Sequence, residues 1–331
     1  MGENDFPFTF QTVSREDEEA KRKVFKEGSL ELNVTQVMPG RIILPKTYEE
    51  DAKRIYNMEL RPDDIWIVTY PKCGTTWTQE SVWQLVNFDL NSNIPFDART
   101  PFLEFGHIMK SSGAFEIKVG SKEPPPEMFT DLVSFIGKMQ SPRVIKTHIP
   151  LELLPPKLVE TCKVVYVCRN PKDTCVSYFH HSAIGKPVYK LYGNFEDYSE
   201  LFFNGRLVYG DYWQHLKSGW ALRGHENFKF IWFEDMKQDH KAGLKDLAQF
   251  LGYERTEEEL DTLVKHLTID NMRNISVAKA RNDYEKEFLA KFFRKGQVGD
   301  WSNYFQGETL QKWNEWIKKH LEGTDIVMRF K

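Results

Sequence analysis

Four short apolar runs alternate with longer amphipathic segments along the chain. The runs are 65–70 (IWIVTY), 143–150 (RVIKTHIP), 163–170 (KVVYVCRN) and 228–235 (FKFIWFED). They have strand length and are rich in β-branched and aromatic residues. Strands that alternate with helical segments favour a parallel sheet that is covered by helices on both faces. The pattern therefore predicts an α/β fold, a single domain with a central parallel sheet flanked by helices.

Helical periodicity and local signals place the main helices. A helix is expected at about 75–88, and another opens at Asn170-Pro171, where proline suits the first turn and Asp173 suits the helix dipole. Residues 241–253 are amphipathic and are stopped by Gly252. The C-terminal segment carries an apolar stripe that we interpret as core packing, made by Leu310, Trp313, Trp316, Ile317 and Leu321.

Two regions carry weaker patterns. Residues 1–45 are polar at first and are expected to form an N-terminal arm that is partly mobile, followed by the main domain over 46–331. Residues 91–130 are interrupted by Pro95, Pro101 and the run Pro124–Pro126, which predicts loops and short helices.

Composition limits the function classes. The net charge is −3, and 28% of the residues are charged, so a nucleic-acid partner or a polybasic membrane contact is not expected. We find neither a signal peptide pattern nor an apolar run of membrane-spanning length. The four cysteines form no CxxC pair, which favours reduced thiols and no metal site. A soluble protein of the cytoplasm is expected.

The end of the first strand has the features of an anion site. Lys72-Cys73-Gly74-Thr75-Thr76 joins a buried strand to a helix start, where free backbone N–H groups and the helix dipole favour an anion. The lysine precedes the glycine, and GxxxxGK[ST] is absent, so this is not a nucleoside triphosphate loop.

Other predicted strands also end in candidate functional residues. Lys146 and His148 follow Val144-Ile145 and share one face of an extended chain. Arg169 ends the third strand, and Ser177 lies two turns into the following helix. A late loop adds Arg294-Lys295-Gly296. Because the carboxyl ends of parallel strands meet at one edge, these residues are expected to converge.

Several segments together resemble the cytosolic sulfotransferases. They are YPKCGTTW, RVIKTHIP, VYVCRNPKDTCVSYFHH and RKGQVGDWSNYF, with PFLEF, FEDM and HLTIDNM in the same order as in that family. The resemblance runs from about residue 60 to 305. It implies a P-loop-like sulfonate site in a sulfotransferase domain (46–331), of the kind used in xenobiotic or hormone metabolism. It also implies 3′-phosphoadenosine 5′-phosphosulfate as the donor, adenosine 3′,5′-bisphosphate as the product, and no metal.

The resemblance assigns roles to residues. His148 is the expected general base, and Lys72 and Lys146 are expected to stabilise the transferring group, tasks that suit a neutral imidazole and two cations. The expected donor-binding residues are Lys72, Cys73, Gly74, Thr75, Thr76, Trp77, Arg169, Ser177, Trp213, Arg294, Lys295 and Gly296. The expected acceptor pocket is lined by Phe102, Phe105, Phe179 and His181, which suggests an apolar or planar alcohol.

The chain departs from the family pattern at several positions. Cys73 replaces a usual serine; either its pKa is lowered beside Lys72, which would make it oxidisable, or it is an inert small residue, the favoured interpretation. Trp213 and Ile269 stand where aromatic residues often lie near the adenine, and Trp213 alone is retained as a candidate. His181 replaces a frequent aromatic gate. NYFQGETLQ does not reproduce the family dimer motif, so a homodimer is possible but not implied.

We therefore expect transfer of a sulfuryl group to a hydroxyl or amine of a small, mostly hydrophobic acceptor such as a phenol, steroid-like or terpenoid alcohol. The alternative is a retinol-dehydratase-like enzyme that sulfates an allylic alcohol transiently and then eliminates sulfate. A non-catalytic ligand-binding protein is disfavoured because Lys72, Lys146 and His148 are all present. A kinase is disfavoured because its phosphate loop and magnesium carboxylate are not found.

Overall fold

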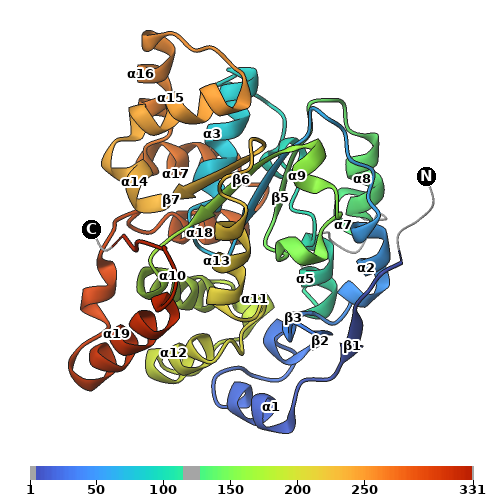
Figure 1. The fold of residues 1–331 in the computed structure, drawn as a ribbon, viewed down its shortest axis with the longest axis vertical. Helices are drawn as coiled ribbons and strands as arrows, with labels where there is room; N and C mark the ends of the chain where they lie inside the picture. Colours follow the sequence, from blue (N-terminus) through green and yellow to red (C-terminus); the bar gives the residue numbers. More distant parts are fainter. Residues whose placement is uncertain (1–4, 115–126, 330–331) are drawn as a thin grey trace.

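A four-stranded parallel sheet forms the centre of the computed structural model, which describes residues 5–114 and 127–329 (Figure 1). Its strands are β4 (Ile65–Thr69), β5 (Val144–Thr147), β6 (Lys163–Cys168) and β7 (Phe228–Trp232). They lie in the order β5-β4-β6-β7, and each neighbouring pair is parallel. The prediction of one α/β domain with a central parallel sheet flanked by helices is confirmed.

The sheet is buried on both faces. In β4, Ile65 and Ile67 belong to one hydrophobic cluster, and Trp66 and Val68 belong to another. Since side chains alternate along a strand, the sheet separates two apolar layers. The layer of Ile65 and Ile67 is covered by α3 (Thr75–Asn87), α14 (Phe233–Gln238), α15 (His240–Leu251), α16 (Glu257–His266) and α17 (Ile269–Ala278). The opposite layer is covered by α2 (Tyr48–Tyr56), α10 (Pro171–Ile184), α12 (Phe195–Phe203), α13 (Tyr212–Ala221) and α19 (Gly307–Leu321).

The predicted main helices form as α3, α10, α15 and α19, and their ends have local causes. The side chain of Asn170 accepts a hydrogen bond from the backbone N–H of Lys172 and so caps α10, whose first residue is proline. Gly252 ends α15 with a φ of 83°, a conformation that favours glycine. In α19, the predicted stripe is a core stripe, because Trp313, Trp316 and Ile317 are buried.

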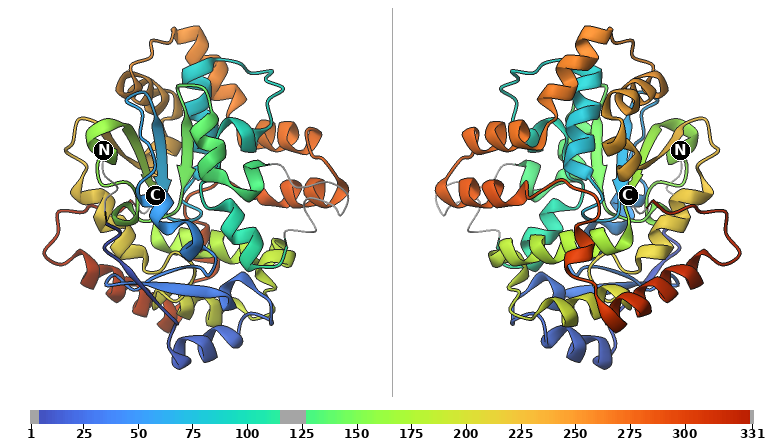
Figure 2. Two further views of the ribbon diagram at one scale, coloured as in Figure 1. Left: turned by 90° about the vertical axis from the view of Figure 1, so that its right-hand side faces the viewer. Right: turned by 90° about the vertical axis from the view of Figure 1, so that its left-hand side faces the viewer.

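The N-terminal segment, expected to be an arm, carries a second sheet. Strands β1 (Thr9–Gln11), β2 (Val34–Met38) and β3 (Ile42–Pro45) pair antiparallel in chain order. They lie with α1 (Arg15–Arg22) at one end of the molecule in Figures 1 and 2. Lys21 and Glu31 form a fully buried ion pair there, and Glu31 also accepts a hydrogen bond from the backbone N–H of Val208. This contact joins the segment to the main body.

Short elements complete the described chain. The remaining helices are α4 (Phe96–Arg99), α5 (Phe105–Ser111), α7 (Glu127–Thr130), α8 (Leu132–Lys138), α9 (Leu158–Thr161), α11 (Lys186–Tyr189) and α18 (Asp283–Phe292). Three 3-10 turns span Leu30–Leu32, Leu151–Leu153 and Asp300–Asn303. The short helices expected within 91–130 are present on both sides of residues 115–126. Residues 115–126, which include the run Pro124–Pro126, lie outside the described residues. None of the helices in the described ranges is long and apolar enough to cross a membrane.

Candidate active site

The turn after β4 forms a compact cradle at the carboxyl edge of the sheet. Lys72 adopts a φ of 69° and Gly74 a φ of 102°, so the backbone reverses tightly before α3 begins at Thr75. A Cβ atom on Gly74 would lie 2.6 Å from Cδ2 of Phe233. Gly74 also precedes α3 without a capping side chain, so the first N–H groups of the helix are directed toward the turn. These features suit a phosphate-like anion.

Cys73 and Thr75 are buried parts of this cradle, whereas Thr76 is half-buried. The thiol of Cys73 lies 3.6 Å from the hydroxyl of Thr174. Burial raises the pKa of Cys73 to about 12, although the hydrogen bond with Thr174 opposes this. A thiol with a raised pKa is a poor nucleophile, so the structure favours the inert interpretation of Cys73.

Lys72 and Lys146 are half-buried lysines that both contact aromatic rings. The Nζ atom of Lys72 lies 4.0 Å from the ring centroid of Phe292, and that of Lys146 lies 3.8 Å from the centroid of Phe102. Burial, together with the positive charges of Lys146, Arg169 and Arg294, lowers the pKa of Lys72 to about 7. Burial likewise lowers the pKa of Lys146 to about 8. An anion between these cations would stabilise their charged forms.

His148 is held in one orientation just after β5. Its Nδ1 atom lies 2.8 Å from the carbonyl oxygen of Thr69, which can only accept, so Nδ1 carries the proton and Nε2 keeps its lone pair. The imidazole packs edge-on against Phe102 and Tyr209, with centroids at 5.0 and 5.3 Å. Burial and the charge of Lys146 lower the pKa of His148 well below 6.5, so the ring is neutral near pH 7. A neutral imidazole with a free Nε2 is a competent base.

Glu104 supports His148 and is a residue that the sequence analysis did not single out. Its carboxylate accepts hydrogen bonds from the backbone N–H of His148 at 2.7 Å and from the hydroxyl of Thr147 at 2.8 Å. The chain around Phe102 pairs with Lys146 as an additional parallel bridge, which places Glu104 beside β5. Burial raises the pKa of Glu104 to about 7. The sequence signal was an acidic residue inside the apolar segment PFLEF.

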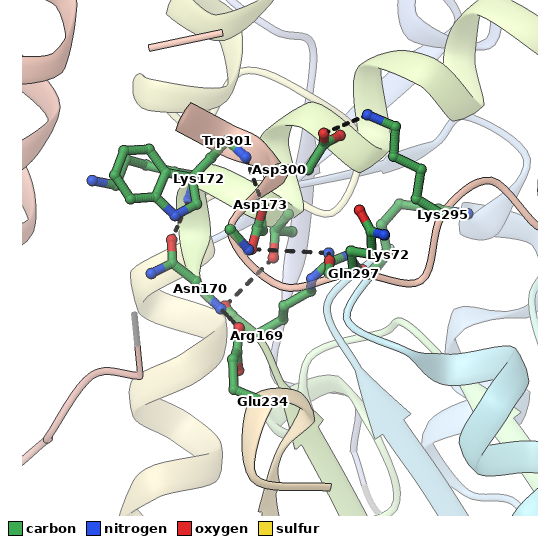
Figure 3. Close-up of polar contacts among 12 residues, drawn as sticks. Lys72, Arg169, Asn170, Lys172, Asp173, Glu234, Lys295, Gln297, Asp300 and Trp301 are labelled. Carbon is green, nitrogen blue, oxygen red and sulfur yellow. Dashed lines mark hydrogen bonds and ion pairs between the residues drawn. The ribbon is translucent and has the colours of Figure 1, made fainter. Parts of the chain in front are cut away.

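A loop after α18 brings further cations to the site. Arg294 pairs with Asp300. Lys295 pairs with the same carboxylate at 2.7 Å (Figure 3). Burial raises the pKa of Asp300, but the hydrogen bonds from Lys295 and Arg294 outweigh this effect and lower the pKa to about 2.

The same loop is anchored on the first turn of α10. The carboxylate of Asp173 accepts hydrogen bonds from the backbone N–H groups of Gly299 and Trp301, and Arg169 donates to the carbonyl of Gln297 at 2.9 Å (Figure 3). Arg169 also donates to the carbonyl of Lys72 at 3.4 Å. Ser177 lies one turn after Asp173 on α10 and is half-buried. The predicted convergence of the cradle, Arg169 and the late loop is therefore observed.

Trp77 has aromatic neighbours that the sequence analysis did not identify. Its ring lies edge-on to Phe233 at 5.6 Å and against His240 at 4.5 Å, and its Nε1 donates to the carbonyl of Leu267. Phe233 also lies against Gly74 and under the guanidinium group of Arg169, at 4.7 Å. Phe233 stands in the segment FEDM, which was part of the family resemblance. The position of Phe233 beside Trp77 depends on the pairing of β7 with β6, which the sequence alone does not show.

Ile269 also belongs to this region, although it was left out of the predicted site. A Cβ atom on Gly296, which has a φ of 59°, would lie 2.4 Å from Cδ1 of Ile269. The late loop therefore approaches the start of α17 closely. Trp77, Phe233 and Ile269 thus lie around the cradle and the late loop.

Trp213 does not belong to this group. It is only 1% exposed, stacks on His320 at 5.0 Å and packs against Trp316 in the apolar layer opposite to that of Trp77. Because residues of α19 cover the ring of Trp213, it has no exposed face on which an adenine could stack. The prediction of Trp213 as a donor-binding residue is therefore corrected: it is a core residue.

The predicted acceptor residues lie in three places. Phe102 and Phe105 lie together at 6.1 Å, with Phe102 against His148. His181 lies 5.7 Å from Phe292, the ring that also contacts Lys72. Phe179 instead packs against Phe195 and Tyr198 of α12, at 5.4 Å from each. α18, a helix that the sequence analysis did not predict, contributes Phe288 and Phe292 to the surroundings of His181.

No cluster of three or more histidine, cysteine, aspartate or glutamate side chains in residues 5–114 and 127–329 could hold a metal ion. An open hollow of about 520 Å³ lies between α17 and α18 and is lined by Asn274, Arg281 and Lys286 among others.

Comparison with known proteins shows which proteins this chain resembles. Residues 62–325 match the sulfotransferase domain family. The chain is 33% identical to sulfotransferase 1C2 of Homo sapiens over 295 residues, which cover 87% of this chain and 92% of that protein. It is 31% identical to luciferin sulfotransferase of Photinus pyralis over 293 residues, 85% of this chain and 77% of that protein. A solved structure of retinol dehydratase with retinol and PAP has a TM-score of 0.84 and 29% identity, covering 98% of this chain and 99% of that one.

Proposed function

This chain belongs to the sulfotransferase family and is a sulfotransferase, and from that premise we propose its donor, its acceptor class and the roles of its residues. The proposed donor is 3′-phosphoadenosine 5′-phosphosulfate, and the acceptor is a small, mostly hydrophobic molecule with a hydroxyl or an amine. The observation that carries the proposal is the arrangement of His148: its Nδ1 is held by the carbonyl of Thr69, which leaves Nε2 as the basic nitrogen, and the charges of Lys146 and Lys72 act on its ring.

The donor fits the charges of the site. The cradle residues Lys72 to Thr76 would bind the 5′-phosphosulfate, because backbone N–H groups and a lysine converge there. Arg169, Ser177, Arg294, Lys295 and the Gly296 backbone would bind the 3′-phosphate, for which charge-assisted hydrogen bonds are well suited. The rings of Trp77 and Phe233 would hold the adenine. Solved structures of retinol dehydratase contain PAP, which supports a nucleotide donor of this kind.

The chain's own residues would perform the transfer. Nε2 of His148 would take the proton of the acceptor hydroxyl as its oxygen approaches sulfur. Lys72 and Lys146 would stabilise the charge that develops on the oxygens of the transferring group and of the leaving phosphate. The donor supplies the activated sulfuryl group. Glu104 would keep the backbone of His148 in place during this step.

The acceptor pocket is proposed around Phe102, Phe105 and His181. The apolar rings suit a phenol, a steroid-like or a terpenoid alcohol. We propose that the protein works in the cytoplasm on a small-molecule acceptor, without a nucleic-acid or membrane partner.

Elimination after sulfation is the second candidate. Two structures of retinol dehydratase have a TM-score of 0.84 with this chain and cover 97% and 98% of it. If this chain shares that outcome, an allylic alcohol would be sulfated and would then lose sulfate. Incubation of the purified protein with labelled donor and separate alcohols distinguishes the two, since a stable sulfate ester supports transfer and an anhydro-alkene supports elimination.

A further inference from the structure

Thr69, the last residue of β4, lies between the anion cradle and His148. It is fully buried. Its Oγ1 atom lies 2.7 Å from the hydroxyl oxygen of Thr75 and 3.0 Å from Nδ1 of His148. Its carbonyl oxygen lies 2.8 Å from the same Nδ1 atom. One threonine therefore contacts the cradle through its hydroxyl and the histidine through two oxygens.

The hydrogen atoms on these groups determine which atom donates in each hydrogen bond between His148, Thr69 and Thr75. A carbonyl oxygen has no hydrogen, so the proton between Thr69 and His148 belongs to Nδ1. Nδ1–H is thus shared between the carbonyl and the hydroxyl oxygen of Thr69. Of the two hydroxyl groups, which lie 2.7 Å apart, we assign Thr69 as the donor and Thr75 as the acceptor, because the oxygen of Thr69 already accepts from Nδ1–H. The hydroxyl hydrogen of Thr75 is then free to point to an anion in the cradle.

We propose that Thr69 is a positioning residue that couples occupancy of the anion cradle to the orientation and basicity of His148. This inference rests on the proposed role of His148 as the general base. An anion that accepts a hydrogen bond from Thr75 makes the Thr75 oxygen a better acceptor, and this polarisation passes through Thr69 to Nδ1–H. A more strongly held Nδ1–H makes Nε2 more basic, so the base is strengthened when the donor is present.

The coupling has a spectroscopic signature that a purely structural role lacks. In the full-length protein labelled with ¹⁵N-histidine, the Nδ1–H signal of His148 is identified by its loss in His148→Asn. Saturation with adenosine 3′,5′-bisphosphate should move this signal downfield in the wild-type protein. In Thr69→Val, which keeps the side-chain shape and removes the hydroxyl, the downfield shift should be absent. Thr69→Ser restores a hydroxyl and should restore the shift.

Turnover gives the second readout. We expect kcat of Thr69→Val to fall by about 10- to 100-fold, while its Kd for adenosine 3′,5′-bisphosphate stays within about threefold, since the cradle itself is intact. Thr69→Ser should recover most of the lost kcat. If the valine variant does not fold, Thr69→Ala provides a second background without the hydroxyl.

The outcomes separate this inference from the proposed function. A nucleotide-dependent shift of Nδ1–H that persists without the Thr69 hydroxyl, or a wild-type kcat in that variant, overturns the coupling. If the shift depends on Thr69 but His148→Ala still turns over normally, the coupling between the cradle and His148 stands. The proposed role of His148 as the base is then wrong.

Discussion

The carboxylate of Glu104 accepts a hydrogen bond from the backbone N–H of His148 at 2.7 Å. This contact fixes the backbone of the histidine, while the carbonyl of Thr69 fixes its ring. His148 is therefore held from two directions, by a loop that pairs with β5 and by the end of β4. Such support places a base accurately, and accurate placement of reacting groups is a large part of catalysis.

Glu104→Ala should reduce both stability and turnover. Two donors that bind the carboxylate, the N–H of His148 and the hydroxyl of Thr147, lose their acceptor in a buried place. We expect the free energy of unfolding to fall by about 2–3 kcal/mol. Glu104→Gln, which keeps one oxygen, should lose less. Urea unfolding together with kcat measures both effects. Glu160→Ala, at an exposed position, is the control, and a Glu104→Ala variant as stable and active as that control would refute the support by Glu104.

His148→Ala should abolish transfer and leave donor binding largely intact, because the proposed donor contacts come from the cradle, Arg169 and the late loop rather than from the imidazole. The pH profile of the wild type adds a second test. Burial holds the pKa of His148 below 6.5, so the base stays neutral and active as the pH falls, and its loss of activity should begin only below pH 6.5. Initial rates across the pH range measure this. Near-normal turnover of His148→Ala would remove His148 from the reaction.

Arg294→Ala and Lys295→Ala should each weaken binding of adenosine 3′,5′-bisphosphate by about 2 kcal/mol, which is ~30-fold in Kd. Each side chain supplies a cation to the late loop that Asp173 anchors. Isothermal calorimetry measures the affinity. Lys291→Ala is the matched control, because Lys291 lies on the exposed side of α18, paired with Glu287. An affinity of the two variants equal to that of the control would show that this loop does not bind the donor.

Donor binding should be accompanied by proton uptake. The pKa of Lys72 is lowered to about 7 by burial and by neighbouring cations, so above pH 7 this lysine is largely neutral in the free protein. A bound anion favours the charged form and raises its pKa. Binding must then take up a proton, and the affinity should fall as the pH rises above 7.

Calorimetry in buffers of different ionisation enthalpy measures the number of protons taken up. We expect net uptake at pH 8 in the wild type and less uptake in Lys72→Met. Part of the uptake should remain in that variant because the pKa of Lys146 is also lowered, to about 8. Identical proton uptake in both proteins would mean that Lys72 does not titrate with the donor.

Much of the fold was predictable because local patterns in the sequence determine its strands and helices. The four apolar runs became β4 to β7, and the helix signals at Pro171 and Gly252 mark the ends of α10 and α15. Lys72, Lys146, His148 and Arg169 were predictable because each lies near or just after the carboxyl end of a strand of the same parallel sheet. Chain position alone placed them at one edge.

Contacts between distant segments were not predictable in this way. Trp213 and Phe233 are both aromatic residues in the second half of the chain, and the sequence does not distinguish their surroundings. The pairing of β7 with β6 places Phe233 beside Trp77. Trp213 is instead covered by α19. The support of His148 by Glu104 likewise depends on the pairing of residues 102 and 146. α18, with Phe292 over Lys72, carried too weak a periodicity to be recognised.

Transfer of the label from ³⁵S-labelled 3′-phosphoadenosine 5′-phosphosulfate is the most direct test of the central claim. The purified protein is incubated with labelled donor and, separately, with phenols, steroids, retinol-like alcohols and catecholamines, and the products are separated and identified. We predict that at least one hydrophobic alcohol becomes a stable labelled sulfate ester, and that His148→Ala forms none. Release of free labelled sulfate with an anhydro-alkene, or no transfer to any acceptor by protein that binds adenosine 3′,5′-bisphosphate, would contradict it.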